Sequence, residues 1–362
     1  MVEAYYAIVL LILALTLPLG SRKLVYSASP EVRGYSPLNG MSGSAHKAAI
    51  VGAVLISIGL IVICIFKPET LPDRAMYEQY YDMGGGDKMN RELEPTFTIL
   101  VRMAPSFMVL LGLYAVLSVS GHIVAIFSNS PNIWLSLLIY LSYTFILHDM
   151  IQMRAGVAIG LLLIAVRFIR ERKWIVYFLF VALAYTFHYS ALIFVFFYFI
   201  PTKHLNKWIW SAILILCTIA GLLNTQLGYV AKFLPVGVVQ TYLENYMGSK
   251  TYIASEIGPA RLFKIFCAII MLFNQKSILR SYPYTIPVLI FYMCSQMSYL
   301  LLSDIPVLQG RFGEMFAAFD IFALAMFPLI SKKHYYLWWI VPIALVVYQH
   351  IEANRLLTYV VN

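Results

Sequence analysis

The sequence RERKWIVYFLFVALAYTFHYSALIFVFFYFIPTKHLNK (Arg170–Lys207) decides how the chain folds. An apolar stretch of 27 residues, Trp174 to Ile200, carries basic residues on both sides. Lysine and arginine in short loops mark the cytoplasmic side of a membrane, so both flanks are expected on that side. A helix rises 1.5 Å per residue, so this stretch is too short to cross a core about 30 Å thick twice. We therefore expect a hairpin of two short helices over residues 174–201, with His188, Tyr189 and Ser190 at its turn.

The composition is that of a membrane protein. Of the 362 residues, 61% are hydrophobic and 12% are charged, whereas soluble domains carry about a quarter charged residues. Shorter apolar segments must be shielded by protein or line a cavity. We expect an all-α polytopic membrane protein of about twelve transmembrane or half-depth helices, folded as a single integral membrane domain over residues 1–362. The apolar segments lie at about 4–20, 48–66, 103–127, 134–147, 155–169, 174–187, 189–201, 208–227, 261–275, 284–302, 314–330 and 335–349.

The distribution of charge gives the expected topology. With the N-terminus outside, the inner loops hold fourteen lysines and arginines against two acids, Glu31 and Glu171. The outer side then has two long loops, at about 67–102 and 228–260, and the turn of the hairpin faces the same side. The segment 4–20 lacks a basic leader and a cleavage site of small residues, so we expect it to be a retained helix. The four cysteines lie in apolar segments without metal-ligand or disulfide spacing.

Four arginines lie at or just inside the outer ends of helices: Arg102, Arg154, Arg261 and Arg311. An ionisable group at this depth is costly, so a function or a partner is expected. The guanidinium fork suits phosphate or carboxylate, and several forks around one cavity would suit a lipid-linked pyrophosphate. Each arginine also has a structural interpretation, such as a pair of Arg154 with Asp149 or of Arg102 with Glu94. Arg311 is expected in a short loop with Glu314.

Other polar residues have two readings as well. His188 is either a residue at the floor of an outer cavity or a buried, hydrogen-bonded core histidine. Asp320, inside an apolar segment, is either functional or a buried partner for a tyrosine or an arginine. Gly156 and Gly160 form a G-x-x-x-G spacing that predicts close helix packing. The outer loops are rich in tyrosines that can hold sugar rings or pack the loops on themselves: Tyr77, Tyr80, Tyr81, Tyr242, Tyr246 and Tyr252.

Five short motifs occur in order and together resemble the EpsG family of Wzy-like polymerases of bacterial O-antigen, capsule and exopolysaccharide. The similarity covers about residues 70 to 330, and the family's usual arginine-glutamine is Arg154-Ala155 here. The motifs are D-R-x-x-Y-x-x-Y-Y (Asp73–Tyr81), E-P-x-F (Glu94–Phe97), M-R-A-G-V-A-I (Met153–Ile159), F-H-Y-S-A-L-I (Phe187–Ile193) and G-R-F (Gly310–Phe312).

The resemblance implies a multi-pass enzyme of the bacterial inner membrane, with a fold like that of the type C glycosyltransferases (GT-C) and a periplasmic active site. It implies transfer of a growing chain from undecaprenyl pyrophosphate onto a new oligosaccharide unit linked to the same carrier. Undecaprenyl-pyrophosphate-linked oligosaccharides, membrane lipid and a chain-length-determining co-polymerase are the expected partners, and nucleic acid is not. We expect no cofactor and no metal, since arginines can stabilise the leaving pyrophosphate.

The expected site combines the residues of these motifs with the outer arginines. The base for the attacking hydroxyl is left open between His188, Asp73 and Glu94, because each can accept a proton. Two other functions remain open: a flippase for lipid-linked glycans, and an O-antigen ligase. The expected catalytic residues are His188, Arg154, Arg311, Asp73 and Glu94, and the expected substrate-binding residues are Arg74, Tyr77, Tyr81, Arg102, Tyr189, Ser190, Arg261 and Lys264.

Overall fold

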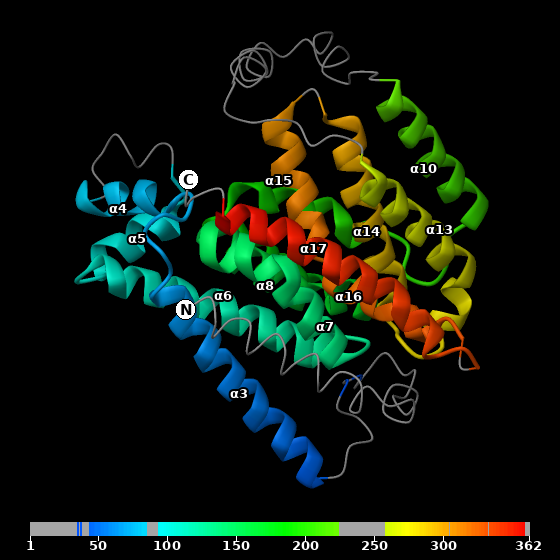
Figure 1. The fold of residues 1–362 in the computed structure, drawn as a ribbon, viewed down its shortest axis with the longest axis horizontal. Coiled ribbons are helices and arrows are strands. Elements are labelled where there is room, and N and C mark those ends of the chain that lie inside the picture. Colours follow the sequence, from blue (N-terminus) through cyan, green and yellow to red (C-terminus); the bar gives the residue numbers. More distant parts are fainter. Residues whose placement is uncertain are drawn as a thin grey trace.

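The structure is a computed structural model that describes residues 35, 37, 43–84, 93–223, 258–303, 305–331 and 333–358. These residues form helices and connecting turns, with no strand among them. Figure 1 shows the helices packed side by side, with α3 and the short helices α4 and α5 at one edge. The expected helix at 4–20 lies outside the described residues, as do residues 228–257 of the second outer loop, which include Tyr242, Tyr246 and Tyr252.

Five helical stretches are long and apolar enough to cross a membrane, counting only the described residues. They confirm a polytopic membrane protein, while the full count of about twelve segments stays a prediction. The five are α3 (Gly43–Ile65), α6 (Phe107–Asn129), α7 (Ile133–Ile139) continued by the π-helix η2 (Tyr140–Ile151), α13 (Pro259–Leu279), and α15 (Pro306–Ala317) continued by α16 (Asp320–Ala323) and η4 (Leu324–Leu329).

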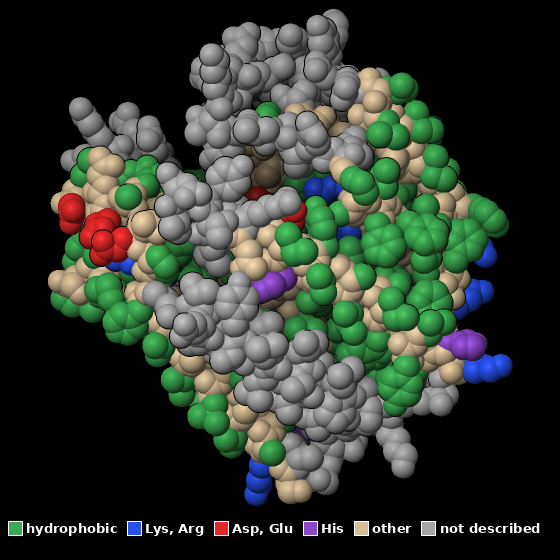
Figure 2. Space-filling view, in the orientation of Figure 1, with side chains coloured by type: hydrophobic (Ala, Val, Ile, Leu, Met, Phe, Trp, Pro, Cys, Tyr) green, Lys and Arg blue, Asp and Glu red, His purple; other side chains and the backbone are tan. Residues whose placement is uncertain are grey.

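The remaining helices are shorter or more charged. Two of them, α4 (Arg74–Asp82) and α5 (Pro95–Met103), lie inside the expected outer loop 67–102, and Arg102 belongs to α5 rather than to the next long helix. Hydrophobic side chains cover the outer faces of α10 and α13, as a lipid-facing surface requires (Figure 2). The others are α8 (Met153–Glu171), α9 (Trp174–Phe187), η3 (Tyr189–Phe199), α10 (Lys207–Leu222), α14 (Thr285–Leu301), η5 (Leu337–Trp339) and α17 (Ile340–Thr358).

The expected hairpin is confirmed. Helix α9 ends at Phe187, His188 adopts an extended conformation, and the 3-10 helix η3 begins at Tyr189. The two arms run antiparallel, because the Tyr177 hydroxyl donates to the Phe194 carbonyl at 2.7 Å. At their open end the Arg172 guanidinium donates to the carbonyls of Tyr198 and Ile200 at 2.9 and 3.2 Å. At 1.5 and 2.0 Å per residue, the 14 and 11 residues both rise about 21 Å, so the arms match in length.

Contacts at the two ends of the bundle agree with the topology derived from charge. Tyr35 belongs to an expected inner loop, and its ring packs at 5.8 and 5.5 Å against Tyr282 and Tyr284 of another. Its hydroxyl donates to the Ser130 carbonyl, in a third inner loop, at 2.9 Å. On the other side, the tip of the hairpin meets the first outer loop. Segments that the charges assign to one side therefore do lie together.

Glycines allow α6 and α8 to approach closely, as the G-x-x-x-G spacing predicted. A Cβ atom at Gly160 would lie 3.1 Å from the Cα of Gly121 on α6. One at Gly156 would lie 2.5 Å from both the carbonyl oxygen of His148 and the Ser118 Oγ. Gly156 thus lets the last turn of η2 fold back against the start of α8, where Arg154 lies.

We expect Gly156→Ala to lower the free energy of unfolding by about 1–3 kcal/mol, because the backbone of η2 would have to move to admit the methyl group. The change can be measured as a lower thermal unfolding temperature of the protein in detergent. Gly52→Ala is the matched control, since that helical glycine has nothing within 4 Å of the added Cβ. An alanine there should be neutral or slightly stabilising. Equal unfolding temperatures for the two variants would contradict this account of the packing.

Candidate functional site

Glu94 is at the centre of the candidate site. It immediately precedes Pro95, the first residue of α5, and only 4% of its surface is exposed. One carboxylate oxygen accepts a hydrogen bond from the Arg154 guanidinium, and the other lies 3.1 Å from Nδ1 of His188. One buried carboxylate thus joins the start of α8 to the tip of the hairpin. We call Glu94, Arg154 and His188 the outer triad.

Arg154 is the second residue of α8, and aromatic rings hold its guanidinium in place. The guanidinium carbon lies 5.4 Å from the ring centroid of Tyr77 and 5.6 Å from that of Phe97, a favourable cation–π geometry. Its Nε also donates to the Tyr77 hydroxyl at 3.5 Å. The side chain keeps 17% of its surface exposed. Arg154 therefore has a fixed position and one open edge from which it can bind an anion.

His188 owes its position to the break between α9 and η3. The Tyr189 hydroxyl donates to the Leu93 carbonyl at 2.9 Å, and the Thr96 hydroxyl donates to the Thr186 carbonyl at 2.8 Å. These two bonds fasten the hairpin tip to the residues around Glu94. An ionised carboxylate only accepts hydrogen bonds, so Nδ1 of His188 carries the proton of this contact. In the neutral imidazole the other nitrogen, Nε2, is then the basic one.

The charges around Glu94 favour its ionised form. Burial by itself would raise the pKa of the Glu94 carboxyl group, but the hydrogen bond to His188 and the charge of Arg154 together hold the pKa below its usual value. Asp73 behaves differently. Burial raises the pKa of its carboxyl group, and Arg154 and Lys67 only partly oppose this. Asp73 also has a positive φ of 64°, a strained conformation for a residue other than glycine.

A buried network supports the turn between η2 and α8. Asp149 accepts hydrogen bonds from the hydroxyls of Ser118 and Tyr140 and lies 3.2 Å from Nδ1 of His122. The ammonium group of Lys67 donates to the neighbouring Met150 carbonyl at 2.6 Å. Burial lowers the pKa of Lys67 to about 8. The expected pair of Arg154 with Asp149 is therefore wrong, because other elements already satisfy Asp149 and Glu94 is the partner of Arg154.

Several expected site residues have structural contacts instead. The Arg74 guanidinium donates to the Lys67 carbonyl and pairs with Glu69 at 3.6 Å. The Tyr81 hydroxyl donates to the Ala104 carbonyl at 3.0 Å. Ser190 is half-buried in the first turn of η3. Within the described residues, no hydrogen bond or ion pair joins these three side chains to the outer triad. Their role in binding substrate stays a prediction.

Arg102 and Arg311 are exposed. The expected pair of Arg102 with Glu94 is wrong, because Arg154 and His188 occupy the Glu94 carboxylate. Arg311 lies within α15, not in a short loop as expected, because the helix already begins at Pro306, a residue suited to a first helical position. No ion pair joins Arg311 to the triad among the described residues. A catalytic role for Arg311 stays a prediction.

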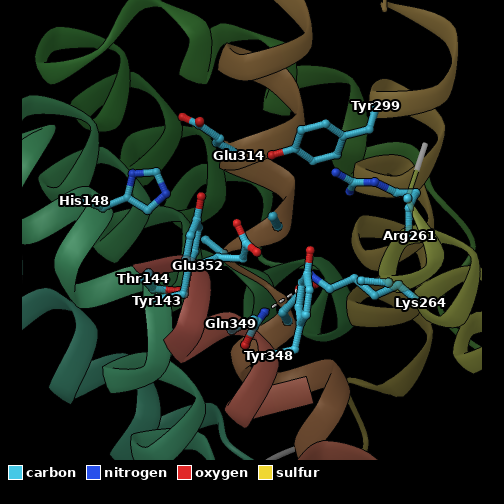
Figure 3. A pocket seen from close by; sticks show the side chains of 15 residues that line it. Tyr143, Thr144, His148, Arg261, Lys264, Tyr299, Glu314, Tyr348, Gln349 and Glu352 are labelled. Carbon is cyan, nitrogen blue, oxygen red and sulfur yellow. Dashed lines mark hydrogen bonds and ion pairs between the residues drawn. The ribbon is translucent and has the colours of Figure 1, made fainter. Parts of the chain in front are cut away.

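Arg261 and Lys264 lie on α13 and line a cavity of about 300 Å³, which is walled also by η2, α14, α15, α16 and α17 (Figure 3). Lys264 pairs with Asp320 at 2.7 Å, so the basic partner of that acid is a lysine and not the expected arginine. Gln152 connects the cavity to the start of α8: its amide donates to Glu314, a cavity residue, at 3.1 Å, and it precedes Arg154 by two residues. Neither Gln152 nor Glu314 was predicted as a site residue from the sequence. Glu314 could have been, because it is an acidic residue in an apolar segment.

Comparison with known proteins gives one family. Residues 44–359 match the family model described as the EpsG family, which covers nearly the whole chain. No match was found among curated proteins or among solved structures.

Proposed function

Because the chain belongs to the EpsG family, whose members are Wzy-like polysaccharide polymerases, we propose that it polymerises lipid-linked oligosaccharide repeat units. The donor is a growing chain on undecaprenyl pyrophosphate, and the acceptor is a new repeat unit on the same carrier. A hydroxyl at the non-reducing end of the acceptor attacks the anomeric carbon of the donor. A glycosidic bond forms, the bond to the pyrophosphate breaks, and undecaprenyl pyrophosphate leaves with the electron pair.

Each member of the outer triad has a role in this proposal. Arg154 binds the pyrophosphate through the exposed edge of its guanidinium and stabilises the charge that develops as it leaves. His188 accepts the proton of the attacking hydroxyl at Nε2 and so acts as the general base. Glu94 holds both side chains in place and stabilises the imidazolium. The single observation that carries this assignment is the contact of one buried carboxylate with both the Arg154 guanidinium and the His188 imidazole.

The arrangement of charge favours a transferase over a transporter. A transporter of lipid-linked glycans would be expected to have polar groups through the bilayer midplane, whereas the triad and the Arg261–Lys264 cavity lie among segments that the charges assign to one side. A ligase would use the same donor with a different acceptor. Deletion of the gene, followed by a gel of the surface polysaccharide, separates these functions. Loss of long chains with single repeats still present supports a polymerase, and loss of every repeat contradicts it.

We further propose that the triad faces the periplasm in the inner membrane and that a chain-length-determining co-polymerase is a partner. Cysteines placed at Lys173 and Lys203 in a cysteine-free background should be labelled by a membrane-impermeant maleimide only after the cells are permeabilised. A cysteine at Tyr185, near the hairpin tip and 36% exposed, should be labelled in cells whose outer membrane alone is opened. Labelling of all three positions under one condition would contradict this orientation.

A further inference from the structure

The cavity beside the outer triad has walls of a distinct kind. Tyr143, Tyr299 and Tyr348 contribute aromatic side chains, and Figure 3 shows their rings bordering the same space as Glu314 and Gln349. Its volume of about 300 Å³ lies at the lower end of the range for small-molecule sites, about 300–1,000 Å³. The cavity therefore suits one compact ring better than a long chain. Aromatic faces with a few polar groups at fixed positions are typical of ligand-binding cavities.

Two polar atoms of the cavity residues are buried without a partner. Nδ1 of His148 and Oδ1 of Asp320 have no hydrogen bond within the part of the chain that the structure describes. The two residues are only 3% and 2% exposed. Figure 3 shows the imidazole of His148 pointing into the space between the walls. Buried polar groups are rarely left unsatisfied, so these two atoms indicate a ligand that supplies hydrogen-bonding groups.

The basic residues of the cavity are already engaged. The Lys264 ammonium pairs with Asp320 at 2.7 Å. The guanidinium of Arg261 lies flat over the Tyr299 ring at 3.6 Å from its centroid and donates to Gln296 at 3.4 Å. Carboxylates of Glu314 and Asp320 face the same cavity. Because Asp320 neutralises Lys264 and the carboxyl group of Glu314 lines the same cavity, the cavity suits a pyrophosphate less well than the open edge of Arg154 does.

We propose that this cavity binds the terminal sugar ring of the acceptor repeat unit. Sugar hydroxyls both donate and accept hydrogen bonds, so a single ring can satisfy the carboxylate oxygen of Asp320 and the imidazole of His148 while its face packs on tyrosine. The inference rests on the proposed function and deepens it. Glu314 accepts a hydrogen bond from Gln152, two residues before Arg154. Through Gln152, a sugar bound against Glu314 is connected to the start of α8, where Arg154 lies.

Binding of a carrier-free oligosaccharide tests the proposal. The probe is the repeat-unit oligosaccharide cut from the cell's own polysaccharide, without lipid or pyrophosphate, titrated calorimetrically into the purified full-length protein in detergent. We expect Glu314→Gln, which changes a hydrogen-bonding group of the cavity, and Tyr348→Ala, which removes an aromatic face, each to weaken binding about tenfold or more. The Tyr348 side chain is 43% exposed, so its truncation leaves no cavity in the hydrophobic core. Tyr336→Ala is the matched control, because Tyr336 is 68% exposed and outside the cavity.

The outcomes separate this inference from the proposed function. Arg154→Ala should slow chain elongation strongly yet bind the oligosaccharide like the unmodified protein. If the unmodified protein makes no polymer but binds the oligosaccharide in a manner that depends on Glu314 and Tyr348, the proposed function fails and the cavity assignment stands. If it makes polymer but binds no oligosaccharide, or binds it equally well in both cavity variants, the cavity assignment is overturned. If inorganic pyrophosphate binds to the unmodified protein and this binding is lost in Lys264→Gln, the cavity assignment is overturned as well.

Discussion

Arg154→Ala is expected to slow chain elongation by about 10²–10³-fold, the usual cost of removing one donor that stabilises a developing negative charge. The guanidinium is the cation of the outer triad with an open edge, so its loss leaves the departing pyrophosphate without its main partner. Cells that carry the variant should show single repeats in place of long chains. Elongation is measured with purified protein and lipid-linked repeat units, with the amount of protein checked. Arg154→Lys keeps the charge without the fork and should give an intermediate rate.

Arg167→Ala is the matched control for this prediction. Arg167 lies on the same helix, is half-buried, and pairs with a carboxylate, Glu171, at 3.1 Å. It lies at the opposite end of α8, among residues that the charges assign to the inner side. Its removal should leave chain length unchanged. Normal chain lengths in Arg154→Ala, or equal losses in both variants, would remove Arg154 from the site.

Glu94→Gln should slow elongation about 10²-fold or more, in the range of lost general base catalysis. The glutamine amide has nearly the same size as the carboxylate but no charge. It therefore cannot form an ion pair with Arg154, and it cannot stabilise an imidazolium at His188. The measurement is the rate of elongation with saturating lipid-linked repeat units. Glu69→Gln is the control, because Glu69 also pairs with an arginine but its side chain is 89% exposed. A Glu94→Gln variant with an unchanged rate would contradict the role of Glu94.

The same substitution also predicts a pH dependence of stability. The pKa of Glu94 is lower in the folded protein than its ordinary value of 4.5. A carboxyl group with a lowered pKa stabilises the fold above its ordinary pKa, and this contribution is lost as the pH falls through the folded value. The unfolding temperatures of the unmodified protein and of Glu94→Gln should therefore differ most near neutral pH and converge below about pH 4.5. A difference that grows towards acid pH would have the wrong sign.

The architecture was largely predictable because it follows from two physical rules. Apolar length locates the helices, and lysine and arginine assign their ends to one side. Together they predicted that the chain turns back at His188, which the antiparallel contacts of α9 and η3 confirm. Periodicity did not reveal that η2 is a π-helix, or that α5 is separate from α6. Those features depend on local packing, such as the close approach of η2 to Gly156.

The identity of several site residues was predictable, but their pairing was not. Arg154 and His188 stood out as polar groups at an outer helix end and at a helix break, and Glu94 as an acid of the E-P-x-F motif in the first outer loop. Glu94 lies 60 residues from Arg154 and 94 from His188, and no sequence pattern specifies contacts over such distances. Asp149, only five positions from Arg154, was the nearer candidate partner. Its contacts with Ser118, Tyr140 and His122 depend on the tertiary fold. The cavity beside Glu314 was unpredictable for the same reason, since six helical segments form it.

Elongation by the purified protein tests the central claim most directly. The unmodified chain, in detergent with a defined undecaprenyl-pyrophosphate-linked repeat unit as its sole substrate, should produce a ladder of longer glycans and release undecaprenyl pyrophosphate in equal number to the bonds formed. His188→Ala, purified in the same way, should produce neither. A ladder of equal length from His188→Ala, or no ladder from the unmodified protein on its own repeat unit, would contradict the claim that the outer triad is the active site of a polysaccharide polymerase.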